Sequence, residues 1–137
     1  MTTRSSIGSS ERPRDMFSSI LKPLAQAQSD SCGCGGGCRA KAMTRLNREG
    51  MEACQAGDFA GADKLLSQAI GMARKAGVSM YEAKMRNNLG LVHLLASRPD
   101  DARREFGAAL DLVAGKLGRE NPLYKKIEGN MSQTRAA

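Results

Sequence analysis

The sequence predicts an all-α protein that folds as a right-handed, antiparallel solenoid of helical hairpins. One observation is an approximate internal repeat, in which small, bulky and small residues recur at an offset of 40 positions: Ala62 with Ala102, Leu66 with Phe106, and Ala69 with Ala109. A fixed offset of this length is typical of stacked helical hairpins. A second observation is that helix-start and helix-stop residues divide positions 39–137 into five helical segments, with no strand pattern between them.

The first two helices are expected at residues 39–56 and 59–75. Gly57 ends the first, because glycine readily takes the left-handed conformation that follows a helix. Asp58 is placed to cap the second helix with its carboxylate. Gly77 then ends that helix, so the two helices form one hairpin with a short connection.

The third helix is expected at residues 79–97, the fourth at 99–118 and the fifth from Pro122 onward. Ser79-Met80-Tyr81-Glu82 has the spacing of a capping box, which predicts the start of the third helix. Pro99 fits the first position of the fourth helix, where its missing N–H costs nothing. The fifth helix therefore supplies only half of a further hairpin.

Residues 1–38 differ in composition from the rest, and we expect a disordered tail that carries a Cys- and Gly-rich segment at residues 32–38. Within it, Met16, Phe17, Ile20 and Leu21 fit two turns of an amphipathic helix. This segment is either a marginal helix that is too short to persist alone, or an anchor that docks in a groove of this chain or of a partner. The helical domain is expected at residues 39–137.

Residues 39–137 resemble tetratricopeptide repeats (TPR). The residues that carry the resemblance are Gly50, Ala53, Gly57-Asp58-Phe59, Ala62, Leu66 and Ala69 in one copy, and Leu89-Gly90, Ala102, Phe106 and Ala109 in the next. The long offset, Asn87-Asn88-Leu89-Gly90 and Leu117-Gly118-Arg119-Glu120-Asn121-Pro122 are similar to the long-helix repeats of kinesin light chains. The chain departs from the family at Glu49, where an apolar residue is usual, and at Ser97-Arg98-Pro99, which replaces the Gly-Asp-aromatic turn. The resemblance implies about two and a half repeats and a concave groove that binds peptides.

Residues of the first, third and fifth helices would line that groove. The candidates for partner binding are Asn47, Met51, Lys84, Asn87, Asn88, Leu91, Lys126 and Asn130. Asn amides both donate and accept hydrogen bonds, so a row of them can hold an extended peptide backbone, and Lys can pair with acidic groups. The alternative is that Asn88 bridges neighbouring helices and Leu91 packs in the core. The expected function is a protein–protein interaction adaptor or assembly factor, with no catalytic constellation, and so short an array also favours self-association.

Cys32, Cys34 and Cys38 are candidate metal ligands, since closely spaced thiolates suit Zn or an iron–sulfur cluster. Cys54 is too far along the following helix to complete the set. The alternative function is therefore a metal-binding, iron–sulfur or redox-sensing protein whose repeats dock it to a client. A flexible linker with incidental cysteines is the third interpretation. His93 is expected in the core rather than at a metal.

The formal charge is +7, which favours acidic protein or peptide partners. Nucleic acid is not expected as a partner, because no recognised reading motif is present and the chain has three Phe, two Tyr and no Trp for base stacking. No apolar run is long enough for a membrane helix, and the N-terminus lacks the apolar run of a secretory signal. These features predict a soluble, cytoplasmic protein without membrane contact.

Overall fold

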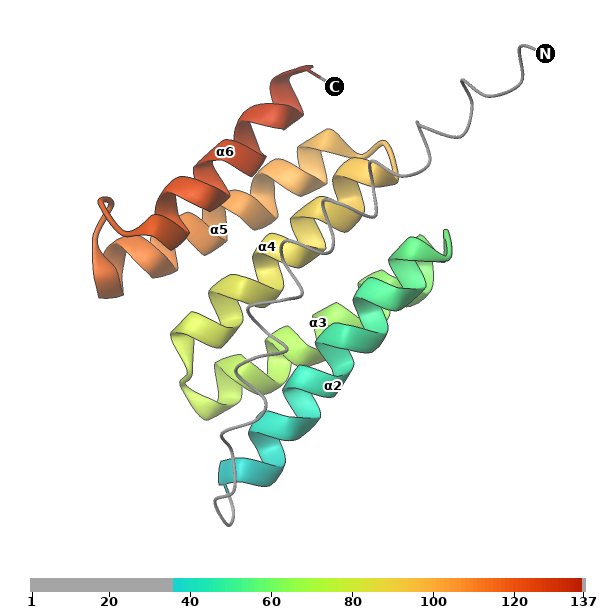
Figure 1. Ribbon diagram of the computed structural model, residues 1–137, viewed down its shortest axis with the longest axis vertical. Helices are drawn as coiled ribbons and strands as arrows, with labels where there is room; N and C mark the ends of the chain where they lie inside the picture. The colour runs from blue at the N-terminus through green and yellow to red at the C-terminus, as the bar shows by residue number, and fades with distance from the viewer. Residues whose placement is uncertain (1–35, 137) are drawn as a thin grey trace, which may run out of the picture.

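The computed structural model describes residues 36–136 and contains five helices (Figure 1). Their bounds are α2 Gly36–Gln55, α3 Phe59–Ala76, α4 Ser79–Leu95, α5 Pro99–Leu117 and α6 Pro122–Ala136. No strand occurs within residues 36–136. The all-α prediction is confirmed for this part of the chain, and the number of helices is as expected.

The connection between α2 and α3 and the end of α3 follow the predicted local chemistry. Asp58 is the N-cap of α3, and its Oδ1 accepts a hydrogen bond of 2.9 Å from the backbone N–H of Gly61. Gly77 follows α3 with a φ of +71°, a left-handed conformation that residues with a Cβ rarely adopt. Pro99 is the first residue of α5, where its fixed φ suits the helix.

Two local predictions need correction. Helix α2 begins at Gly36 rather than at residue 39, so Cys38 lies in its first turn and not in a hinge before it. The capping box at α4 is wrong, because Val78 is the N-cap and Ser79 is already helical. Glu82 does not reach back to the helix start; its carboxylate instead pairs with the guanidinium groups of Arg74 and Arg86.

Each helix packs on the next one along the chain, and α4 also makes smaller contacts with α2 and with α6. Figure 1 shows the result: α2, α4 and α6 lie in one layer, and α3 and α5 lie behind them in a second layer. We call the exposed side of the first layer the α2–α4–α6 face. Sequence-distant residues meet there because α2 and α4 run side by side.

The repeat positions place a glycine of one helix against a bulky residue of the next. Gly50 in α2 faces Leu66 in α3, and a Cβ built at Gly50 would lie 2.9 Å from Leu66 Cγ. Gly90 in α4 faces Phe106 in α5 in the same way, and its Cβ would lie 2.5 Å from Phe106 Cε1. Leu66 and Phe106 are fully buried. The recurring small and bulky residues therefore set how closely the helices of each hairpin approach.

Both ends of the helical array present polar side chains. On α2, Arg45 pairs with Glu49 and Arg48 pairs with Glu52 across one turn. On α6, the exposed residues include Lys125, Glu128, Ser132 and Arg135. Polar outer faces are typical of the terminal helices of solenoids. Self-association through these ends stays a prediction, and the polar surfaces argue against it.

Candidate functional site

Four asparagines join the three helices of the first layer. Asn88 Nδ2 donates to Asn47 Oδ1 at 2.6 Å, which links α4 to α2. Asn130 Nδ2 donates to Asn87 Oδ1 at 2.9 Å, which links α6 to α4. Consecutive residues of a helix point about 100° apart, so the adjacent pair on α4 can serve a neighbour on each side. All four asparagines were candidates for partner binding, and in the structure their side chains bond to one another between helices.

The side-chain Oδ1 of Asn88 has no hydrogen-bond partner although it is buried. The residue as a whole is fully buried, and so are Met51 and Leu91, two further candidates for partner binding. An unsatisfied buried acceptor costs free energy, which a donor from a ligand would recover. The alternative that Asn88 bridges neighbouring helices agrees with its bond to Asn47.

Two lysines are the more accessible candidates on the same helices. Lys84 on α4 is half-buried and Lys126 on α6 is exposed. Lys84 precedes Asn88 by one helical turn, and Lys126 precedes Asn130 by one turn, so each lysine lies beside an asparagine. The asparagine hydrogen bonds between α2, α4 and α6 do not involve these two lysines.

An ion-pair network crosses from α3 through α4 to α5, and sequence reasoning missed it. Arg86 Nε lies 2.9 Å from Glu82 Oε1, and Arg86 Nη1 lies 2.8 Å from Glu105 Oε2. Arg74 Nη2 approaches the same Glu82 oxygen at 3.4 Å. The spacing of Glu82 and Arg86 by one turn was a usable signal, whereas nothing in the sequence indicates that Glu105 joins them.

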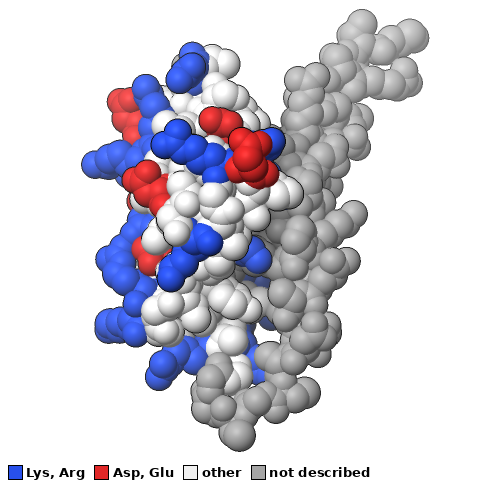
Figure 2. All heavy atoms as spheres, turned by 90° about the vertical axis from the view of Figure 1, so that its left-hand side faces the viewer, with Lys and Arg blue, Asp and Glu red and all other residues white. Residues whose placement is uncertain are grey.

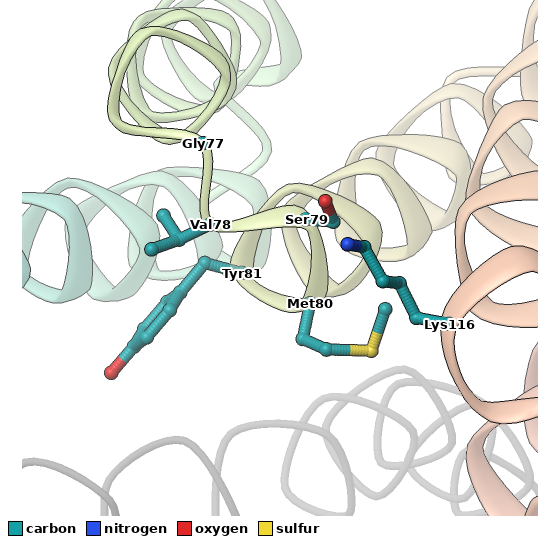
Figure 3. Close-up of a pocket in the computed structure, with 6 residues that line it drawn as sticks. All are labelled: Gly77, Val78, Ser79, Met80, Tyr81 and Lys116. Atoms are coloured by element: carbon teal, nitrogen blue, oxygen red, sulfur yellow. The ribbon is translucent and has the colours of Figure 1, made fainter.

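An apolar hollow lies where the α3–α4 turn meets the end of α5 (Figure 3). It is an open hollow of about 280 Å³ and is lined by Gly77, Val78, Ser79, Met80, Tyr81 and Lys116. Lys116 reaches from α5 towards Ser79, while the side chains of Met80 and Tyr81 diverge below the first turn of α4.

Figure 2 shows the side of the molecule that is on the left in Figure 1. On this side, Lys and Arg side chains predominate over Asp and Glu.

Of the candidate metal ligands, only Cys38 belongs to the part of the chain that the structure describes. It is exposed in the first turn of α2, and Cys32 and Cys34 lie outside the described residues. Within residues 36–136 no group of three His, Cys, Asp or Glu side chains could hold a metal ion. A zinc or iron–sulfur site at the three cysteines therefore stays a prediction.

Cys54 is expected to resist alkylation in the folded protein. Its side chain is buried, and this burial raises the pKa of the thiol to about 11. At pH 8 the thiolate fraction is then roughly 200-fold lower than for a thiol with a pKa near 8.5. Peptide mapping after iodoacetamide treatment should find Cys38 modified within minutes and Cys54 modified only after urea is added. Equal rates in the native protein would contradict the buried position.

His93 lies in the core, as expected, and its Nδ1 is buried without a hydrogen-bond partner. Burial lowers the pKa of the imidazole, and the positive charge of Arg98 lowers it further. The carboxylates of Asp63, Asp101 and Glu105 act in the opposite direction. Because burial is the largest of these effects, the neutral form of the ring is favoured in the folded state.

The protein should therefore lose stability as the pH falls below about 6.5, the value for an unfolded His. The folded-state pKa is lower than the unfolded one, so the native state binds fewer protons in the window between them. The free energy of unfolding then decreases on acidification by at most about 1.4 kcal/mol per pH unit from this group. Urea unfolding at several pH values, compared between the wild type and His93→Leu, isolates the effect. A pH dependence that is the same in both proteins would refute it.

Comparison with known proteins adds no relative. No protein-family model matches the chain, and neither curated proteins nor solved structures contain a match. None of the helices among residues 36–136 has the length and apolar character needed to cross a membrane. The function must therefore be argued from the residues themselves.

Proposed function

We propose that this protein is an interaction adaptor that binds an extended peptide segment of a partner along the α2–α4–α6 face, in the manner of a tetratricopeptide repeat protein. The buried Asn88 Oδ1 that lacks a partner carries the proposal. It lies on the central helix of the layer, within the row of asparagines that joins all three helices. Because Asn88 is fully buried, a peptide N–H would reach this oxygen only after the side chains that cover it move apart. Such a contact would be made through the peptide backbone, with little dependence on sequence.

The two lysines beside the row of asparagines favour acidic partners. Lys84 and Lys126 lie one turn before asparagines of the row, where an ammonium group could pair with an acidic side chain or a terminal carboxylate. The excess of basic over acidic residues in the chain acts in the same direction by attracting such partners over longer distances. The repeat pattern supports an adaptor.

Asn88 itself is a poor choice for testing the proposal. Its replacement by Ala would remove the hydrogen bond to Asn47 and leave the buried Oδ1 of Asn47 without that donor. Such a change costs about 1–3 kcal/mol of stability whether or not a peptide binds. Lost binding could then reflect a damaged fold.

The test therefore uses charge reversal at the lysines. Peptides selected from a random display library on the full chain would be titrated by fluorescence anisotropy against wild type, Lys84→Glu and Lys126→Glu. We expect at least about tenfold weaker binding of acidic peptides by each variant, since a charge-assisted hydrogen bond contributes about 1.5–3 kcal/mol. Lys64→Glu and Lys75→Glu are matched controls, because these exposed lysines belong to α3 in the second layer.

Two results would overturn the proposal. One is a library that yields no binding peptide at all. The other is a set of selected peptides whose affinity falls equally with the α3 controls, because general charge attraction would then explain the binding. Circular dichroism of each variant verifies that the fold is retained.

A further inference from the structure

No described residue fills the apolar hollow beside the α3–α4 turn. Val78, Met80 and Tyr81 give it apolar walls, and Lys116 places a single cation at its rim (Figure 3). All three apolar residues are only half-buried. A ligand for this site should bring a few apolar side chains and, beside them, one negative charge.

The chain enters the described structure at the same end of the helical array. Helix α2 starts at Gly36, and α4, which runs alongside it, starts at Ser79 next to the hollow. Figure 1 shows both helix starts towards the lower left of the molecule. The chain therefore joins the described structure at the end of the array where the hollow lies.

Residues 1–31 contain one cluster of large apolar side chains with helical spacing, and it has the required composition. Met16, Phe17, Ile20 and Leu21 form this cluster, and Asp15 directly precedes it. Residues 22–35 connect it to α2 and can span up to about 50 Å when extended. Neighbouring helices are only about 10 Å apart, so this connection is long enough without strain.

We propose that the segment Asp15–Leu21 docks in this hollow of its own chain, with the apolar side chains against Val78, Met80 and Tyr81 and with the Asp15 carboxylate near Lys116. The docking closes residues 22–35, which include Cys32 and Cys34, into a loop that ends at the first turn of α2. The site is distinct from the α2–α4–α6 face and does not depend on peptide binding there.

A single tryptophan can report the docking, since the chain contains none. In full-length Phe17→Trp, we expect blue-shifted emission and reduced quenching by acrylamide relative to a free peptide of residues 10–25 with the same substitution. The signal should persist in high salt because the contact is mainly apolar. It should also be independent of protein concentration.

Substitutions in the hollow locate the contact. Adding Met80→Glu should abolish the blue shift and restore quenching, and a Glu in the first turn of α4 is compatible with the helix dipole. Met72→Glu is the matched control, because Met72 is a half-buried methionine on α3 that does not line the hollow, and it should leave the signal unchanged. Lys116→Glu should weaken the docking, and Asp15→Lys in the same chain should restore it.

Three outcomes would overturn the proposal. Emission equal to that of the free peptide would show that the segment is not docked. A blue shift that survives Met80→Glu would place the segment elsewhere on the protein. A blue shift that disappears on dilution would show that the segment binds a second copy of the chain.

Discussion

Replacement of Gly90 by Ala should destabilise the protein, whereas replacement of Gly71 by Ala should stabilise it. Both glycines lie inside helices, Gly90 in α4 and Gly71 in α3. A Cβ at Gly90 would lie 2.5–2.9 Å from three atoms of the Phe106 ring, while a Cβ at Gly71 would have no atom within 4 Å. The two substitutions therefore share the same change in helix propensity and differ only in packing.

The expected magnitudes follow from these two contributions. Ala is favoured over Gly in a helix by about 1 kcal/mol, which is the gain expected at Gly71. Overpacking of a core typically costs about 1–3 kcal/mol, and the fully buried Phe106 ring has little room to move. Gly90→Ala should therefore lose up to about 2 kcal/mol net, measured as a lower midpoint in urea unfolding with an unchanged slope.

A second substitution verifies the cause. Phe106→Leu removes ring atoms that the new Cβ would meet, so its combination with Gly90→Ala should cost less than the sum of the two single changes. Additive costs would show that contact with the ring is not responsible. A stabilising effect of Gly90→Ala would mean that the hairpin tolerates a wider separation of α4 and α5.

This close contact also explains why the fold was predictable from the sequence. Helix boundaries depend on local residues such as Asp58, Gly77 and Pro99, and those predictions were confirmed. The pairing of a glycine with a bulky residue repeats along the chain, so Gly50 with Leu66 and Gly90 with Phe106 can be aligned by their spacing alone. These features act over a few turns of helix, where sequence spacing is a reliable guide.

Other features depend on contacts that sequence spacing does not fix. Glu82 has the spacing of a capping residue, but its carboxylate pairs with Arg86 one turn further along α4 and with Arg74, which the packing of α3 against α4 brings near. The pairing of Asn130 with Asn87 rather than with Asn88 depends on the rotation of α6 against α4. The hollow beside Lys116 likewise arises only where two helix ends meet.

Replacement of Arg86 by Met should be among the most destabilising single substitutions in the protein. Arg86 is the shared partner of Glu82 and Glu105, and its side chain is only 15% exposed. Without it, Glu105 loses its partner at 2.8 Å, and Glu82 keeps only the more distant and mostly exposed Arg74. Glu105 would then lack the counter-charge of Arg86, and Glu82 would keep only the weaker one of Arg74.

Removal of one member of a buried ion pair costs about 3–5 kcal/mol when the remaining charge is inaccessible to water. Both carboxylates here retain some exposure, so we expect about 2–3 kcal/mol, measured by urea unfolding. Arg103→Met is the matched control. Arg103 also pairs with a carboxylate one turn away, but this pair with Asp100 is exposed, and its loss should cost at most about 1 kcal/mol.

The loss of stability in Arg86→Met has two possible causes, uncompensated charge and lost packing of the arginine side chain, and a further variant separates them. If uncompensated charge is responsible, Arg86→Met combined with Glu82→Gln and Glu105→Gln should be more stable than Arg86→Met alone, because the amides need no counter-charge. A triple variant as unstable as the single one would assign the cost to the aliphatic part of Arg86, which Met replaces only in part. Recovery in the triple variant would instead show that charge balance is what this network supplies where α4 joins the two hairpins.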